Sequence, residues 1–253
     1  MELMKEHIKP HWLRFRIAEV DEVPDLKMAT DDWPFLYTRR PMIPKHNITG
    51  IAMMIVLSLG LYWLSSRYAG AAESNTTTSR SDTGLMLRSF FLGAGFMLIE
   101  TKAVVHMALL FGSTWTVNTV VFAAILMMSL AGTLLAAVIK PKNLLPYYVL
   151  LFITLAVNIA VPPDTFLGLA PALQITLSCL IAFAPVAVAG IIFSVSFSRT
   201  SNPDRMFGAN VAGALVGGLA ENASMLLGFR LLGLVAVAFY LLSGLVGNAK
   251  SDK

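Results

Sequence analysis

The amino-acid sequence predicts an all-α protein: a polytopic bundle of about seven transmembrane helices, one of them broken, preceded by a short polar N-terminal extension. The first observation is composition, because 56% of the 253 residues are hydrophobic and only 13% are charged. A soluble domain carries about 25% charged residues and could not bury this much apolar surface. The second observation is run length, since several apolar runs reach the roughly 20 residues that an α-helix needs to cross a bilayer. Unbroken runs of this kind also lack the alternation expected of membrane β-strands.

Two regions follow from the change in polarity: a polar extension over residues 1–46 and a transmembrane domain over residues 47–248. The extension holds eight acidic residues and eight Lys or Arg residues, so its net charge is close to zero. Proline punctuates it, which disfavours long helices, at positions 24, 34, 41 and 44. The predicted membrane spans are 48–68, 84–111, 114–139, 144–161, 172–198, 205–227 and 230–247.

The second predicted span, residues 84–111, is long and carries ionisable side chains. These are Arg88, Glu100, Lys102 and His106. Each glycine of Gly-Ala-Gly at 93–95 weakens a helix by about 1 kcal/mol. Charged groups on a straight membrane helix are also carried toward lipid. We therefore expect a kink, break or re-entrant turn between Gly93 and Lys102.

Basic residues between the spans bear on orientation, because short cytoplasmic loops are rich in Lys and Arg. One group lies in the later loops and the C-terminal tail: Lys140, Lys142, Arg199, Arg205, Lys250 and Lys253. A second group precedes the first span: Arg39, Arg40 and Lys45. The two groups share one side if the second span breaks and returns to its side of entry, which predicts a cytoplasmic extension. An extension outside the cytoplasm is the alternative.

Glu221 is the first candidate for an intramembrane polar site. Ala209, Gly213 and Gly217 precede it at four-residue steps, so all four residues share one helix face. Such a small-residue stripe lets membrane helices pack closely, which predicts that Glu221 points into a helix interface. Two interpretations remain open: a proton or cation site, or a packing acid bonded to a donor such as Asn222, Asn210 or Lys102.

Glu100, Lys102 and His106 form the second candidate polar group. Lys102 and His106 are four residues apart and share a helix face, while Glu100 lies on another. One interpretation is a charged cluster that lines a cavity at a helix break. The other is that the helix ends near Thr101 and that the Lys102 side chain snorkels to the headgroups.

Several functional classes lack support in the sequence. The net charge of +4 is small and scattered, which argues against a nucleic-acid partner. His7 and His11 are separated by Pro10 and have no further ligands at suitable spacing for a metal site. The glycine-rich stretch at 208–218 lies in a predicted membrane span and lacks the spacing of a phosphate loop. We therefore expect no cofactor, no metal and no catalytic residues in this chain.

Three segments resemble the bacterial spermidine synthase-like membrane proteins, in which membrane helices flank an aminopropyltransferase- or methyltransferase-like domain. They are TDDWPFLYTR at 30–39, FFLGAGFMLIETKAVVHMALLFGSTWTVN at 90–118 and FSVSFSRTSNPDRMFGANVAGALVGGLAENASMLLGFRLLGLVAVAFYLLS at 193–243. The resemblance implies the membrane portion of that family in a bacterial inner membrane. The extension contains no glycine for a cofactor loop and is too short for a nucleotide-binding core, so it looks like a stub of the soluble domain.

Three functions are consistent with these features. The leading hypothesis is a non-catalytic membrane subunit, a helical scaffold that packs against partner membrane proteins, lipid or pigment. A second is a transporter of a small organic cation or a proton-coupled solute, with Glu100 and Glu221 as its acids. A third is the membrane anchor of a split methyltransferase- or aminopropyltransferase-like enzyme whose soluble part is a separate chain.

Overall fold

The computed structural model describes residues 29–30, 32–35, 41–69, 80–112 and 115–248. Helices occupy all seven predicted spans, and the described residues contain no strand beyond an isolated bridge between Thr30 and Trp33. The predicted fold class is therefore confirmed. The helices are α1 (Lys45–Ala69), α2 (Arg80–Phe111), α3 (Trp115–Ile139), α4 (Leu145–Ala160), α5 (Pro171–Phe197), α6 (Pro203–Ala220), α7 (Ser224–Leu227) and α8 (Phe229–Asn248). Short 3₁₀ helices cover Pro163–Phe166 and Glu221–Ala223.

Proline and glycine set the ends of several helices. Pro171 and Pro203 are the first residues of α5 and α6, where the missing amide hydrogen of proline costs nothing. Gly112 follows α2 and Gly228 follows α7, with φ angles of 83° and 85° that residues other than glycine rarely adopt. The sequence therefore places its helix-ending residues where the apolar runs end.

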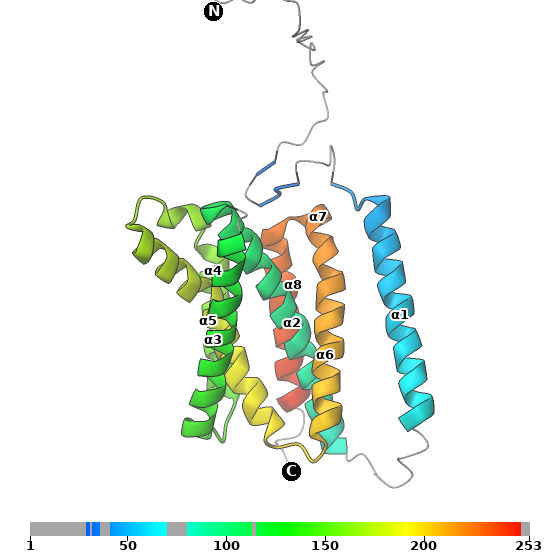
Figure 1. Ribbon diagram of the computed structural model, residues 1–253. Coiled ribbons are helices and arrows are strands. Elements are labelled where there is room, and N and C mark those ends of the chain that lie inside the picture. Colours follow the sequence, from blue (N-terminus) through cyan, green and yellow to red (C-terminus); the bar gives the residue numbers. More distant parts are fainter. Residues whose placement is uncertain (1–28, 31, 36–40, 70–79, 113–114, 249–253) are drawn as a thin grey trace, which may run out of the picture.

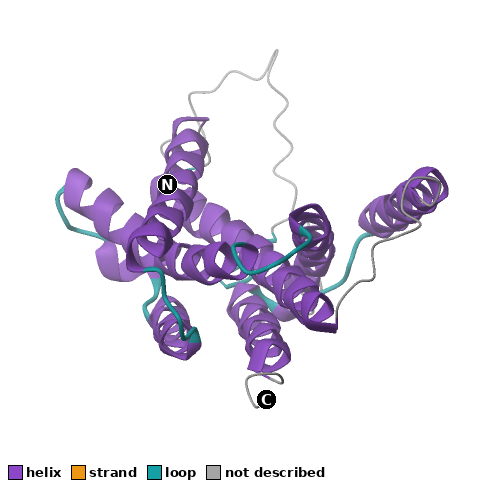
Figure 2. Ribbon diagram, turned by 90° about the horizontal axis from the view of Figure 1, so that it is seen from below, coloured by secondary structure: helices purple, strands orange, loops and turns teal. Residues whose placement is uncertain are grey.

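Helix α2 lies at the centre of the bundle and packs against α3, α5, α6 and α8 (Figure 1). Helix α5 also packs against α3 and α4, and α4 reaches α8. Helix α1 is different, because it stands apart at one edge of the bundle in both views (Figures 1 and 2). The buried core consequently lies among α2 to α8.

Four described helices are long and apolar enough to cross a membrane: Thr83–Phe111, Val117–Ile139, Pro171–Phe197 and Phe229–Val246. Helix α4 is apolar but shorter. Many large apolar side chains on these helices face outward, such as Leu126 of α3 with 70% of its surface exposed. Hydrocarbon accommodates such surfaces, so this is a membrane protein.

The closest helix contact joins α2 and α6 through glycine. A Cβ added at Gly213 would collide with the Phe90 carbonyl of α2, and one added at Gly217 would collide with the Ala94 carbonyl. Gly93 of α2 meets the backbone of Asn210 in the same way. The small-residue face of α6 therefore lies directly against α2, with the two backbones in contact.

The expected break or re-entrant turn in the second span is wrong, because α2 runs as one helix from Arg80 to Phe111. The glycines at 93 and 95 serve helix packing instead. Gly93 admits α6, and a Cβ on Gly95 would lie 2.8 Å from the Tyr240 ring of α8. Packing offsets the weak helix propensity of glycine, and lipid penalises any broken backbone hydrogen bond.

The interruption falls in the span predicted at 205–227. There α6 ends at Ala220, a 3₁₀ turn covers Glu221–Ala223, and the short α7 follows. The stripe of small residues thus ends where the regular helix ends.

A continuous α2 also changes the argument about orientation. The loops after α3 and α5 carry Lys140, Lys142 and Arg199, and Arg199 Nη2 donates to the carbonyls of Pro141 and Lys142. These loops lie at the lower end of the bundle in Figure 1, whereas α1 begins with Lys45 at the upper end. The reason for expecting a cytoplasmic extension is therefore removed.

We predict that Gly213→Ala destabilises the bundle although alanine is the better helix former. The added methyl group would overlap the Phe90 carbonyl, and such overpacking costs about 1–3 kcal/mol. Gly208→Ala is the matched control on the same helix, because no atom lies within 4 Å of its Cβ position. Denaturant unfolding in micelles measures both variants. Equal stability of the two variants would contradict the proposed backbone contact.

Candidate functional site

Lys102 lies inside the bundle with only 3% of its surface exposed. Its Nζ donates to Asn158 Oδ1 on α4 at 2.9 Å and to the Asn158 carbonyl at 3.4 Å. The Asn158 amide nitrogen in turn donates to the carbonyls of Ile181 and Ala182 on α5, at 3.4 and 3.3 Å. The expected snorkelling of Lys102 is wrong, because this side chain ties three helices together.

A small cavity of about 30 Å³ lies beside this network. His106 of α2, Asn158 of α4 and Ser178 of α5 contribute its polar lining. Ser178 is 2% exposed and its hydroxyl has no hydrogen-bond partner. The volume and the polar lining suit a single water molecule.

Glu221 lies in the 3₁₀ turn after α6, half-buried against α2. Its Oε2 accepts a 3.0 Å hydrogen bond from the Thr101 hydroxyl. The donor is thus Thr101, and not Asn222, Asn210 or Lys102 as expected. Asn222 instead accepts a 3.2 Å bond from the Asn47 amide of α1. The turn at 221–222 therefore contacts both α1 and α2.

The remaining predicted site residues lie elsewhere. Glu100 is half-buried on α2, and no hydrogen bond or ion pair to its carboxylate occurs among the described residues. Asn210 donates to the Ser89 carbonyl of α2 at 3.0 Å, one turn from the stripe residue Gly213. Ala209 is half-buried on α6. Lys102 and His106 thus lie beside the same small cavity, whereas Asn210 and Glu221 form separate helix contacts.

A second buried cation, Arg88, was not predicted as a site residue. It is 5% exposed, and its guanidinium lies 5.9 Å from the centre of the Tyr148 ring on α4. Its Nη1 donates to Ser196 of α5 at 3.4 Å, and Tyr148 and Ser243 share a 2.8 Å hydroxyl contact. The available signal was a charged residue in an apolar span for Arg88, and a polar amide in the apolar span of α4 for Asn158.

Residues 32 and 33 of the polar extension rest on the bundle. Trp33 is 2% exposed, and its Nε1 donates to the Met225 carbonyl of α7 at 2.8 Å. The Asp32 carbonyl accepts from Phe229 N at 2.9 Å, and Asp32 Oδ1 accepts from Arg230 N at 2.6 Å. Asp32 thus caps the first turn of α8 from a distant part of the chain.

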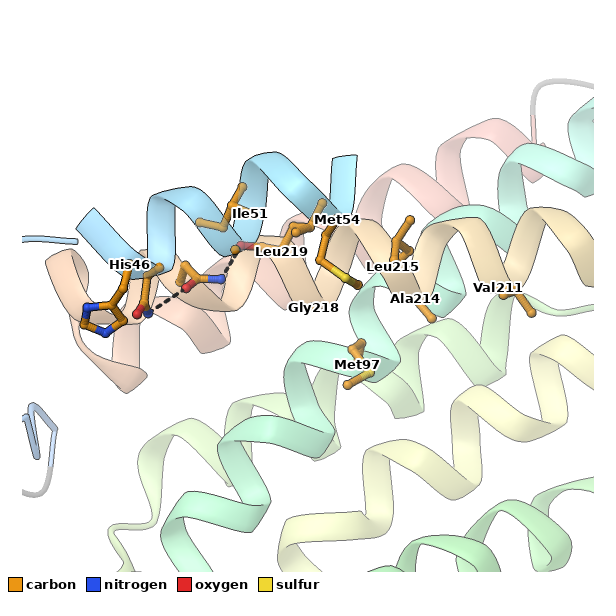
Figure 3. A pocket seen from close by; sticks show the side chains of 12 residues that line it. His46, Ile51, Met54, Met97, Val211, Ala214, Leu215, Gly218 and Leu219 are labelled. Atoms are coloured by element: carbon orange, nitrogen blue, oxygen red, sulfur yellow. Dashed lines mark hydrogen bonds between the residues drawn. The ribbon is translucent and has the colours of Figure 1, made fainter. Parts of the chain in front are cut away.

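An open groove of about 680 Å³ separates α1 from α6 (Figure 3). Gly50, Ile51 and Met54 of α1 lie on one side, Ala214 and Gly218 of α6 lie on the other, and Met97 of α2 forms the floor. Most of the lining is apolar. The groove is bounded at one end by the bond between Asn47 and Asn222.

Among the described residues, no group of three or more His, Cys, Asp or Glu side chains could hold a metal ion. His7, His11 and most of the extension lie outside the described residues. Comparison with protein-family models, curated proteins and solved structures gives no match. The resemblance to the spermidine synthase-like proteins therefore stays a prediction.

We predict that Lys102 and Asn158 are energetically coupled. Asn158→Leu removes the Oδ1 acceptor and should cost roughly 3–5 kcal/mol, since it leaves a buried charge without its partner. Lys102→Met should cost less, because the charge is removed as well. The double variant Lys102→Met/Asn158→Leu should then be more stable than the sum of the single losses implies, by about 0.5–3 kcal/mol in unfolding measurements. Strictly additive losses would contradict the coupling.

We also predict that Asp32→Ala frays the start of α8. Loss of a capping side chain costs about 0.5–2 kcal/mol, so the Arg230 amide should exchange hydrogen for deuterium several-fold faster. Asp204→Ala is the control, because Asp204 is an exposed acid in the first turn of α6. Hydrogen-exchange mass spectrometry of the α8 peptides should respond to the first substitution alone. Unchanged exchange in Asp32→Ala would show that the extension does not cap α8.

Proposed function

We propose that this chain is a non-catalytic integral membrane scaffold whose groove between α1 and α6 receives a transmembrane helix of a partner protein. The observation that carries the proposal is the open groove of about 680 Å³, which exists because α1 stands apart from the bundle. Its walls are helices and its lining is apolar, as an occupant within the membrane requires.

The two faces of α6 support a helix as the occupant. On the packed face, Gly213 and Gly217 bring the α6 backbone into contact with α2. On the groove face, Ala214 and Gly218 are small residues as well. A Cβ added at Gly218 would meet only Met97, at 3.7 Å. Across the groove, no atom lies within 4 Å of the Cβ position of Gly50. Membrane helices associate through such small-residue faces, because close packing replaces the hydrophobic driving force.

The polar side chains favour a scaffold over a transporter. Thr101 and Glu221 bond to each other across the contact between α2 and the turn after α6. Lys102 bonds to Asn158, which bonds onward to α5. These groups therefore hold helices together.

The proposal includes an orientation in a bacterial inner membrane, which the resemblance to the spermidine synthase-like proteins suggests. The end that carries Lys140, Lys142 and Arg199 faces the cytoplasm under the positive-inside rule. The extension then lies on the opposite side of the membrane. Its own basic residues are balanced by an equal number of acids.

Site-specific photo-crosslinking in native membranes tests the proposal. A photoreactive residue at Ala214 should capture an apolar segment of about 20 residues from one other membrane protein. The same residue at Leu126, on the exposed face of α3, should capture lipid. Ala214→Trp should fill the groove and lower the amount of co-purified partner about tenfold, whereas Leu126→Trp should not. Capture of lipid alone from Ala214, or of a second copy of this chain, would refute a partner scaffold.

A further inference from the structure

Helices α3 and α5 both end at the lower end of the bundle in Figure 1. A basic pocket of about 550 Å³ lies between residues at these two helix ends. Lys140, Lys142 and Arg199 contribute three positive charges to its lining. Ser194 and Ser198 contribute hydroxyl groups, and Ala136 lies among its apolar residues. None of the lining residues is acidic, so the pocket has uncompensated positive charge.

Rigid elements position these cations. Gly132 of α3 packs against the backbone of α5 at Ala187 and Gly190, about one turn before the pocket. Lys140 follows α3 with a φ angle of 48°, a left-handed conformation that turns the chain away from the helix axis. Arg199 Nη2 then holds the loop by donating to Pro141 O at 2.7 Å and to Lys142 O at 2.8 Å. The loop backbone that carries both lysines is therefore held beside Arg199.

The electrostatics of the pocket favour an anion. The last carbonyls of a helix carry a partial negative charge of about half an elementary charge. The three positive charges of the pocket exceed the partial negative charges at the C-termini of α3 and α5. Arg199 also donates hydrogen bonds to two loop carbonyls. Like charges gathered in one pocket repel one another, so an anion bound among them is stabilised.

The surroundings of the pocket point to a lipid as the source of that anion. The pocket lies where two membrane-spanning helices end, at the level of the headgroups. The neighbouring surface of α3 is apolar, with Val138 81% exposed and Leu135 47% exposed. A phosphate in the pocket would thus leave its acyl chains free to lie along α3.

We propose that this pocket binds the phosphate-bearing headgroup of an anionic phospholipid. Basic pockets between transmembrane helices at the cytoplasmic surface recognise such headgroups, and each Lys or Arg contributes to the affinity. Lys140 and Lys142 are exposed and supply charge, whereas Arg199 both supplies charge and fixes the loop. The site is distinct from the groove between α1 and α6, and it does not depend on the proposed partner.

Native mass spectrometry of the detergent-solubilised full chain tests the site with three probes: phosphatidylglycerol, phosphatidylcholine and inorganic phosphate. Phosphatidylglycerol should be retained about tenfold more tightly than phosphatidylcholine. The double variant Lys140→Gln/Lys142→Gln should lose that preference, since each cation near the membrane surface favours anionic lipid by several-fold. Lys45→Gln is the control, because Lys45 is an exposed lysine at the opposite end of the bundle.

Four outcomes would overturn the proposal. Equal retention of the two lipids would show that the pocket does not distinguish an anionic headgroup from a zwitterionic one. An unchanged preference in the double variant would place the lipid elsewhere. An equal loss in Lys45→Gln would indicate diffuse electrostatics, and displacement of the lipid by equimolar inorganic phosphate would identify a site for free anions. Normal thermal unfolding of the double variant confirms that any loss is not due to misfolding.

Discussion

The structure depends on the hydrogen bonds by which three side chains of the central helix α2, those of Ser89, Thr101 and Lys102, reach neighbouring helices. Hydrocarbon offers no hydrogen bonds, so an unsatisfied group there costs several kcal/mol. Ser89 bonds to α6, Thr101 bonds to Glu221, and Lys102 bonds to α4. Because these bonds lie at different heights and point to different helices, they fix both the rotation and the depth of α2. The arrangement of the other helices around α2 follows from this.

Glycine makes those bonds geometrically possible. The hydroxyl of Thr101 reaches Glu221 because α6 lies against α2 at Gly213 and Gly217. A wider separation would leave both groups unpaired in a lipid environment. The close backbone contact and the polar contact therefore support each other, which explains why an acid follows the stripe of small residues on α6.

The sequence predicted the helices well and the polar contacts poorly, for physical reasons. Run length against bilayer thickness is a local property, so all seven spans could be located. The partners of Lys102 and Thr101 lie 56 and 120 residues away, and no local pattern specifies them.

The break was expected beside Gly93 because helix propensity was considered without tertiary packing. Gly93 admits α6 instead, and the interruption falls after Ala220. Asn158 was overlooked because a single amide in an apolar run carries little weight until its neighbours are known.

The turn at Gly228, between α7 and α8, explains why the extension is attached to the bundle where it is. An interrupted helix leaves carbonyl groups at its end and amide groups at the start of the next helix, and in or near lipid these need partners. Two adjacent residues of the extension supply them: Trp33 donates to the Met225 carbonyl, while Asp32 accepts from Phe229 and Arg230. The turn at Gly228 therefore creates the docking site for the extension. Asn47 joins α1 to Asn222 in the separate 3₁₀ turn after α6. Because α1 is anchored at that interruption of the helix, the interruption determines which end of the groove is closed and which part stays open to the membrane.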